Sequence, residues 1–322
     1  MFIVELQKVR KIYDTKVAVD ELSFSIEPGT MFGLLGPNGS GKTSTIRMMI
    51  GITVPDSGTV RLFERPFGRE SLKRVGYLPE ERGLYKKMNV LEQLVFLGQL
   101  HGLDASTATK RAREWCERMQ ITEAIPKKTE ELSKGMQQKI QFISTLLHDP
   151  DLIIMDEPFS GLDPVNASLL MDTLLDLRRQ GKTILFSTHR MDQVEKLCDA
   201  IALIAGGKLL LSGGMREIKS RYPRNRVVVT FEGDDRFLHH PSVEEFKDYS
   251  GYVEVKLKTT PGSSPDAQPV LAEAVSRGTR IYRFEVMEPT LEEIFIDIVG
   301  ANHADFDTSW RQSIATGGIV HA

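Results

Sequence analysis

The feature that most constrains the fold of this chain is a glycine-rich loop at positions 36–43, which reads Gly-Pro-Asn-Gly-Ser-Gly-Lys-Thr. It follows a short apolar run at 30–35 and precedes a helix-like run at 43–50, and its spacing is Gly, four residues, Gly, Lys, then Ser or Thr. Glycines let the backbone curl until successive N–H groups point at one anion, and the helix behind them adds its dipole. The sequence therefore predicts an α/β fold in which a strand, a phosphate-binding loop and a helix follow one another.

The last two residues of the loop carry the chemistry of nucleoside triphosphate binding. Lys42 can place its ammonium against the β and γ phosphates, and the hydroxyl of Thr43 can complete the shell of a Mg²⁺ ion. A glycine-rich turn can also arise by chance, but the strand and the helix on either side argue against it. We expect ATP and Mg²⁺ as ligands, with the loop contacts Gly36, Pro37, Asn38, Gly39, Ser40, Gly41, Lys42 and Thr43.

A second element is an apolar strand at 152–155 that ends in two acids, Asp156 and Glu157. A buried strand that delivers a carboxylate to its carboxyl end can hold Mg²⁺ near a γ phosphate. We expect Asp156 to bind the ion and Glu157 to act as general base on the attacking water. Taken alone, paired acids at a strand end are as often ordinary surface residues. Together with the glycine loop they indicate ATP hydrolysis.

Composition and charge exclude several classes of protein. The 322 residues are 41% hydrophobic and 26% charged with a formal net charge of -3, which gives no reason to expect a nucleic acid partner. Cys116 and Cys198 lie far apart and are expected to be reduced packing residues. The N-terminus lacks a secretory signal, and the longest apolar tract, 201–211, is too short and too interrupted to cross a bilayer. A role in a membrane process would require a partner.

The pattern along the chain predicts an ATPase domain at 1–222. Alternating runs at 2–9 and 17–26 indicate antiparallel strands, and helical spacing between 90 and 147 indicates a helical subdomain at about 88–148. Beyond residue 150, strands and helices alternate as far as residue 205, which is typical of a parallel sheet with helices on its faces.

A small α+β domain is predicted at 223–300. Strands are expected at 226–231, 252–258 and 281–287, and helices at 267–276 and 289–299. The segment 260–268 is rich in Pro, Gly and Ser and is predicted to be a loop. The tail at 301–322 has little periodicity, which indicates disorder.

The segment 132–138, Leu-Ser-Lys-Gly-Met-Gln-Gln, resembles the signature motif of the ABC ATPases, and it precedes the acidic strand as it does in that family. The resemblance covers roughly residues 2–220. Tyr13 is similar to the aromatic residue that stacks on adenine, and the segment 160–163 is similar to the loop that crosses a dimer interface. His189 is similar to the family's switch histidine.

The resemblance implies a P-loop NTPase core with an antiparallel β subdomain and a helical subdomain, and it implies further site residues. These are Tyr13, Ser133, Gly135 and Asp163 as nucleotide contacts and His189 as a catalytic residue. Each has a plainer interpretation when taken alone. Tyr13 is more often a packing residue, His189 a satisfied polar group at a strand end, and Ser133 with Gly135 a helix cap.

Two segments depart from the family pattern. Glu80 stands where the family has a glutamine that senses Mg²⁺ and contacts the membrane partner, and we expect it near the metal. Lys134 and Met136 stand where glycine and glutamine are commoner, which leaves the fine contacts of this segment open.

The resemblance further implies that two chains, copies or homologous ATPase subunits, close head to tail around two ATP molecules and move an integral membrane permease. This places the chain on the cytoplasmic face of the cell membrane. The segments 77–85 and 288–295 resemble exporter ATPases of the sodium- and drug-efflux type, which favours export. The alternative is a soluble ABC-type ATPase in translation or DNA maintenance, which the single phosphate loop and the absence of heptads and basic patches disfavour. For the second domain, dimerisation or regulation is favoured over passive packing.

Overall fold

The computed structural model describes residues 1–81, 83–259 and 265–301, so the predicted tail from residue 302 and much of the predicted 260–268 loop lie outside it. The chain divides into two compact units, the first ending at Gly214 and the second beginning at Met215. The division lies eight residues before the predicted boundary at 222. The strand β10 (Lys208–Gly214) ends the first unit, and the helix α8 (Met215–Ser220), with Met215 and Ile218 buried, begins the second immediately. Two glycines, Gly213 and Gly214, lie at that junction.

The first unit begins with an antiparallel sheet in the order β2-β1-β4-β5. Its strands are β1 (Val4–Tyr13), β2 (Lys16–Ile26), β4 (Ser57–Leu62) and β5 (Arg65–Pro66). Strands β1 and β2 form the predicted antiparallel pair, and the turn between them places Asp14 at a φ of 51°. Alternation of apolar and polar residues along these strands buries one face, as expected for a sheet with one side in water.

The second sheet of this unit is mostly parallel and has the order β10-β9-β3-β8-β7-β6. Besides β10 it contains β9 (Ala200–Ala205), β3 (Met31–Leu35), β8 (Thr183–Thr188), β7 (Leu152–Asp156) and β6 (Val75–Leu78). Every residue of β3, β7 and β8 is buried, because helices or the other sheet cover both faces. This explains why the apolar residues of these strands follow one another without alternation.

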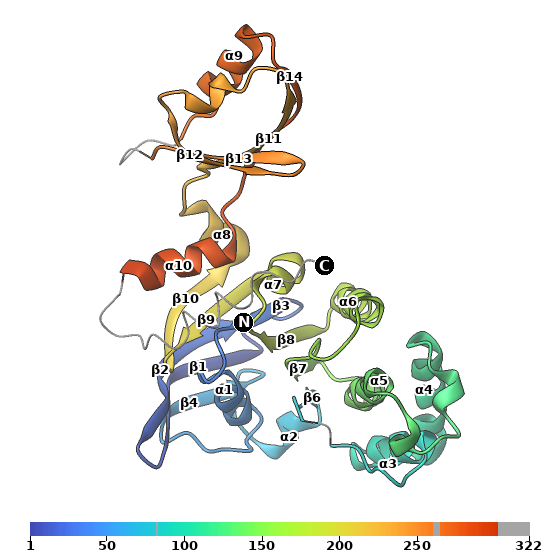
Figure 1. Cartoon of the computed structure of the whole chain (residues 1–322). Coiled ribbons are helices and arrows are strands. Elements are labelled where there is room, and N and C mark those ends of the chain that lie inside the picture. The colour runs from blue at the N-terminus through green and yellow to red at the C-terminus, as the bar shows by residue number, and fades with distance from the viewer. Residues whose placement is uncertain (82, 260–264, 302–322) are drawn as a thin grey trace. The chain divides into compact units, whose positions relative to one another are not determined.

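Helices complete the first unit (Figure 1). Those beside the sheets are α1 (Lys42–Met49), α2 (Arg69–Leu72), α6 (Pro164–Arg179) and α7 (Met191–Leu197). The helical subdomain contains α3 (Val90–Leu100), α4 (Ala105–Arg118), the short η1 (Thr122–Ala124) and η2 (Thr129–Glu131), and α5 (Lys134–Leu146). One apolar core joins both sheets and α1, since Leu22 of β2, Ile46 of α1 and Ile154 of β7 belong to the same buried cluster.

The second unit is an antiparallel sheet in the order β12-β13-β11-β14 with helices. Its elements after α8 are β11 (Arg226–Glu232), η3 (Arg236–His239), β12 (Val243–Tyr249), β13 (Tyr252–Leu257), α9 (Gln268–Ser276), β14 (Arg280–Met287) and α10 (Leu291–Ala301). Val229, Val255, Phe237 and Val270 form its own core. This unit has the α+β composition predicted for it, with β12 as a strand that the sequence did not indicate.

Two further sequence predictions can be compared with the described residues. Cys116 and Cys198 are both free and buried, as packing residues should be. Within residues 1–81, 83–259 and 265–301, no helix combines the length and the apolar character needed to span a membrane.

Candidate nucleotide-binding site

The parallel sheet brings the phosphate loop and the acidic strand to one edge. The loop follows the carboxyl end of β3 and leads into α1. Strand β8 lies between β3 and β7, and it pairs Thr188 with Leu35 on one side and Ser187 with Asp156 on the other. Because all three strands run in the same direction, the loop, the acids and the segment that leads to His189 meet at the same edge.

Two glycines of the loop are required by close approach of other backbone segments. Gly36 has a φ of +153°, and a Cβ atom there would lie 2.1 Å from the carbonyl oxygen of Ile204. Gly41 has a φ of +109°, and a Cβ atom there would lie 2.4 Å from the carbonyl oxygen of Ala18. The loop is therefore held between β9 and β2, with Asn38 and Gly39 exposed at its tip.

Lys42 is buried at the start of α1 and lies over its own loop. Its Nζ donates to the carbonyl oxygens of Gly36 at 2.7 Å and of Pro37 at 3.2 Å. Burial lowers the pKa of Lys42, while the negative charges of Glu157, Asp156 and Glu80 oppose this shift. The first turn of α1 has no acidic residue and no side-chain cap, so its N–H groups remain available to an anion.

Asp156 has the features of a metal-binding carboxylate. Its side chain is 1% exposed, and its Oδ1 accepts a short hydrogen bond from the hydroxyl of Ser187. Its Oδ2 is buried without a partner, as is the hydroxyl oxygen of Ser40 in the loop. Orphaned oxygens at a phosphate-binding loop fit a hard cation that takes oxygen ligands. Thr43, half-buried at the second position of α1, could supply another ligand.

Glu80 is exposed just beyond the end of β6, the strand next to β7. Its charge acts on Lys42 and on Tyr77, so it faces the same edge of the sheet. No group of three or more His, Cys, Asp and Glu residues in the described part of the chain could hold a metal alone. A cation here would therefore take ligands from the phosphates and from water, which is usual for Mg²⁺.

Glu157 lies between a lysine and a histidine. Its Oε1 is 3.8 Å from Nζ of Lys42 and 3.0 Å from Nδ1 of His189. The side chain of Glu157 is 11% exposed and that of His189 is 50% exposed, so the pair marks the boundary between the buried site and solvent. The residue has a φ of +49°, a left-handed conformation that is uncommon outside glycine and that turns the carboxylate back towards the loop edge.

Ser187 connects the two acids and is a residue that sequence reasoning missed. It is fully buried on β8, and besides bonding Asp156 it accepts the backbone N–H of Glu157 through both its carbonyl oxygen and its Oγ at 3.2 Å. One hydroxyl thus fixes the carboxylate of one acid and the backbone of the other. The available signal was a polar residue inside an otherwise apolar strand, two positions before His189.

The other predicted contacts lie on different elements from the loop. Ser133 is exposed and caps α5 by accepting the N–H of Met136, and Asp163 caps α6 by accepting the N–H of Asn166. Gly135 lies beside the second cap, since a Cβ atom there would be 3.6 Å from Nδ2 of Asn166. Figure 1 shows α5 and α1 apart, with β6 and β7 drawn between them. The structure therefore gathers Ser133, Gly135 and Asp163 into a second cluster.

Tyr13 stands at the end of β1 and is 40% exposed, so it is not the packing residue that a lone tyrosine often is. The ammonium of Lys11 lies 5.6 Å from its ring centre. The other strand of the same hairpin, β2, reaches the phosphate loop at Ala18.

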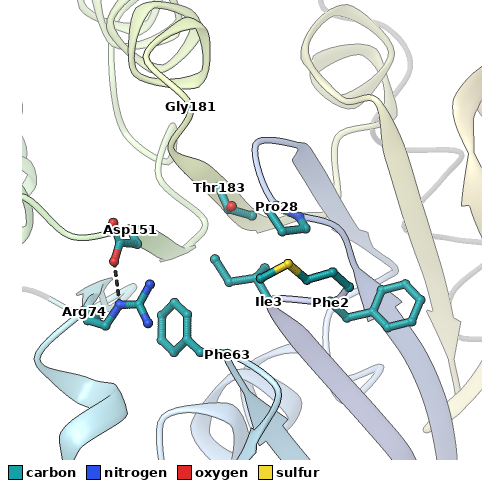
Figure 2. Close-up of a pocket in the computed structure, with 9 residues that line it drawn as sticks. Phe2, Ile3, Pro28, Phe63, Arg74, Asp151, Gly181 and Thr183 are labelled. Atoms are coloured by element: carbon teal, nitrogen blue, oxygen red, sulfur yellow. Dashed lines mark hydrogen bonds and ion pairs between the residues drawn. The ribbon is translucent and has the colours of Figure 1, made fainter.

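A pocket of about 260 Å³ lies at the opposite edge of the parallel sheet, where β7 and β8 begin (Figure 2). Asp151 and Thr183 line it at these strand starts, and Arg74 lies over the ring of Phe63 at 3.9 Å while it pairs with Asp151 at 2.6 Å. The ion pair satisfies both charges within the chain. This pocket is separate from the phosphate loop, and we assign it no part in nucleotide binding.

Comparison with known proteins agrees with this geometry. A family model described as ABC transporter matches residues 19–160, and another described as ATP-binding protein DrrA1-3-like, C-terminal domain, matches residues 213–299. The uncharacterized ABC transporter ATP-binding protein YhaQ of Bacillus subtilis (strain 168) is 43% identical over 297 residues, which are 92% of this chain and 98% of that protein. The chain belongs to the ABC transporter ATP-binding proteins. ATP binding and ATP hydrolysis are the activity of this family and of this chain.

Two more comparisons extend the assignment. Nod factor export ATP-binding protein I of Paraburkholderia xenovorans (strain LB400) is 34% identical over 305 residues, which are 94% of this chain and 98% of that protein. A solved structure of the ATP binding subunit of an ABC transporter aligns with a TM-score of 0.64 and 27% identity, covering 68% of this chain and 92% of that chain. The predicted ABC ATPase fold is thereby confirmed.

Proposed function

We propose that this ABC ATPase hydrolyses ATP with Mg²⁺ held by Thr43, Asp156 and Glu80, and with Glu157 as the general base. The observation that carries the proposal is the joint placement of a buried lysine, an orphaned carboxylate oxygen and a glutamate–histidine pair at one edge of the sheet. The cation, when bound, would neutralise developing charge on the phosphate oxygens.

The chain's own groups account for binding and for proton transfer. Lys42 and the N–H groups of the loop, residues 36–43, hold the β and γ phosphates. Glu157 accepts the proton of the attacking water, because its carboxylate lies at the solvent boundary within reach of a water beside the loop. His189 donates to the γ phosphate and orients Glu157 through their 3.0 Å contact.

The site becomes complete only in a head-to-tail dimer. Ser133 and Gly135 lie at the start of α5, where an exposed hydroxyl and N–H groups form an anion site, yet they belong to a cluster separate from their own phosphate loop. We propose that they contact the γ phosphate bound by a second copy or a homologous subunit. Asp163 belongs to the same surface, and Tyr13 stacks on the adenine.

The transport function rests on the relatives. Nod factor export ATP-binding protein I shares 34% identity over nearly its whole length, and we propose that this chain also serves export. Its partner is an integral membrane permease, and its place is the cytoplasmic face of the cell membrane. The docking surface is the segment after Glu80, where Tyr85 is 51% exposed and packs edge-on against Phe96. Identity with YhaQ over 92% of the chain supports transport over the soluble alternative.

We further propose that the ATPase domain and the small α+β domain act as separate modules, with the helical subdomain at about 88–148 inside the first. The C-terminal family model, which matches residues 213–299, supports this division. Since the second unit has a core of its own, it can fold around it without the ATPase unit.

The decisive variant for hydrolysis is Glu157→Gln. Because the carboxylate acts as a base and not as a binding group, turnover should fall by roughly a hundredfold or more while ATP affinity is retained. Lys42→Ala is the matched control, since it should weaken ATP binding itself. Equilibrium binding of a fluorescent ATP analogue and phosphate release would be measured for both. Loss of ATP binding in Glu157→Gln would show that the role assigned to Glu157 is wrong.

Export is tested separately with the permease. Inside-out membrane vesicles that bear the chain and its co-purifying membrane subunit expose the ATPase to the medium, so they should accumulate a cation or drug in their lumen when ATP is added. Release of a preloaded nutrient from the lumen under the same conditions would overturn the proposed direction. Co-sedimentation with ribosomes in place of membranes would favour the soluble alternative.

A further inference from the structure

The sheet of the second unit has an edge strand, β14, whose residues are all exposed or half-buried. It pairs with β11 on one side, and no strand of the described residues pairs with it on the other (Figure 1). The side chains of Arg283 and Glu285 are each about half exposed and form an ion pair along the strand, with 2.9 Å between Arg283 Nε and Glu285 Oε2. A free edge of this length is a template for another strand.

Symmetry limits how this edge can pair with a second copy of itself. A two-fold axis normal to the sheet gives an antiparallel pair and keeps the helix-covered faces of both sheets on the same side. In such a pair, two residues that lie directly opposite each other point to the same face of the sheet. Because side chains alternate between faces along a strand, the sequence numbers of the two residues must differ by an even number. Each possible register is therefore centred on one residue, which faces its own copy.

The register centred on Phe284 is self-complementary. It places Arg283 of each copy opposite Glu285 of the other, so two charge pairs form on the open face of the sheet. Phe284, half-buried against the core of its own unit, meets its counterpart at the axis on the helix-covered face. Centring on Arg283 or Glu285 would instead place like charges in contact.

The other edge of the same sheet, β12, offers no such register. Its sequence from 244 to 248 is Glu-Glu-Phe-Lys-Asp, and centring on any charged residue opposes that residue to itself. Centring on Phe246 opposes Glu245 to Lys247, but it also opposes Glu244 to Asp248. Each register centred within 244–248 thus contains a like-charge contact, as expected for an edge protected against self-association. The contrast shows that self-complementarity is a property of β14 and not of any charged edge.

We propose that two copies of this chain associate through antiparallel pairing of their β14 strands about Phe284. The pairing joins two four-stranded sheets into one, with main-chain hydrogen bonds supplying affinity and the Arg283–Glu285 pairs fixing the register. It needs no nucleotide, so it is independent of the ATP-dependent contact between the ATPase units. Such a contact keeps two chains at high effective concentration while their ATP sites are open.

Charge exchange tests the register in the full-length, nucleotide-free chain. Arg283→Glu or Glu285→Arg alone opposes two pairs of like charge, and each should weaken self-association by roughly tenfold. An equal mixture of the two variants restores opposite charges at both positions, so it should associate about as strongly as the unchanged chain. Sedimentation velocity over a concentration series measures all four samples. Unchanged association in both single variants, or a mixture no stronger than its components, would overturn the proposal.

Cysteine cross-linking tests the axis independently. Phe284→Cys places two thiols opposite each other and should give a covalent dimer under mild oxidation, since Cys116 and Cys198 are buried. Val286→Cys is the control, because it is 44% exposed on the same strand but lies two residues from the axis, so it does not face its own copy. Equal dimer yields from the two variants, or none from Phe284→Cys while its far-ultraviolet circular dichroism is unchanged, would contradict the proposed pairing.

Discussion

A single buried hydroxyl, that of Ser187, organises the acidic end of the nucleotide site. It donates to Asp156 and accepts from the backbone of Glu157, and it comes from the neighbouring strand β8. Because this bond occupies Oδ1 of Asp156, only Oδ2 of that carboxylate remains free for a cation. It also helps hold Glu157 in its left-handed backbone conformation. Small errors in the position of either acid would be amplified in the rate, because both act on the same phosphoryl group.

Replacement of Ser187 by alanine should therefore lower activity only because Asp156 and Glu157 are no longer held in place. We expect ATPase turnover and Mn²⁺ affinity to fall by roughly ten- to a hundredfold, as for other groups that orient metal ligands. Steady-state ATPase assays and Mn²⁺ titration by electron paramagnetic resonance would measure the two effects. Thr183→Ala, which removes a buried hydroxyl at the other end of β8, should leave both nearly unchanged. Equal losses in the two variants would mean that Ser187 serves stability only.

At the scale of elements, a stacked histidine pair connects the helical subdomain to the parallel sheet. His101 ends α3 and His148 follows α5, and their rings stack at 3.9 Å between centres with an interplanar angle of 7°. His148 Nε2 donates to the carbonyl oxygen of Val75 at the start of β6, the strand that leads to Glu80. The two rings cannot both be charged in this arrangement, because two imidazolium rings in contact would repel.

Burial, with a smaller contribution from the charge of His101, lowers the pKa of His148 to about 4. Between pH 6.5 and 4 the unfolded chain binds a proton at this residue and the folded chain does not, so stability must fall as the pH falls. The loss attributable to His148 is roughly 3 kcal/mol across this window. His148→Gln, which keeps an N–H donor for Val75, should remove that part of the pH dependence in urea unfolding. An identical pH dependence in the variant would contradict this account.

The sequence predicted most elements because their apolar patterns agree with their final environments. The apolar residues of the runs that became β3, β7 and β8 follow one another without alternation, and each strand is buried on both faces. Strand β12 was missed because its residues 244–248 are charged or aromatic, with little alternation, and only Val243 is buried. It is a strand because β13 supplies its hydrogen bonds, so tertiary pairing outweighed local preference.

At the scale of the whole molecule, the sequence indicated which residues belong to the site but not that they form two separate clusters. Local pattern identified the phosphate loop and the paired acids, and the resemblance to the ABC signature motif identified the segment around Ser133, since each motif is local. What no local pattern could give is that Ser187 joins the acids across two strands, or that Ser133 and Gly135 cluster with Asn166. Both depend on which strands and helices become neighbours. This separation supports the proposal that Ser133 contacts the nucleotide of a second subunit.

We propose that the loop of one chain and the Ser133 segment of another together form each active site. Mixing two inactive variants tests it most directly: Lys42→Ala, which disables the loop, and Ser133→Arg, which blocks the segment. Half of the randomly formed dimers would contain one chain of each variant. In such a dimer one site combines the intact loop of the Ser133→Arg chain with the intact segment of the Lys42→Ala chain, and the other site carries both defects. ATPase activity of the equimolar mixture should therefore recover to about a quarter of the unchanged chain's value. Activity no higher than the mean of the two separate variants would contradict a shared site.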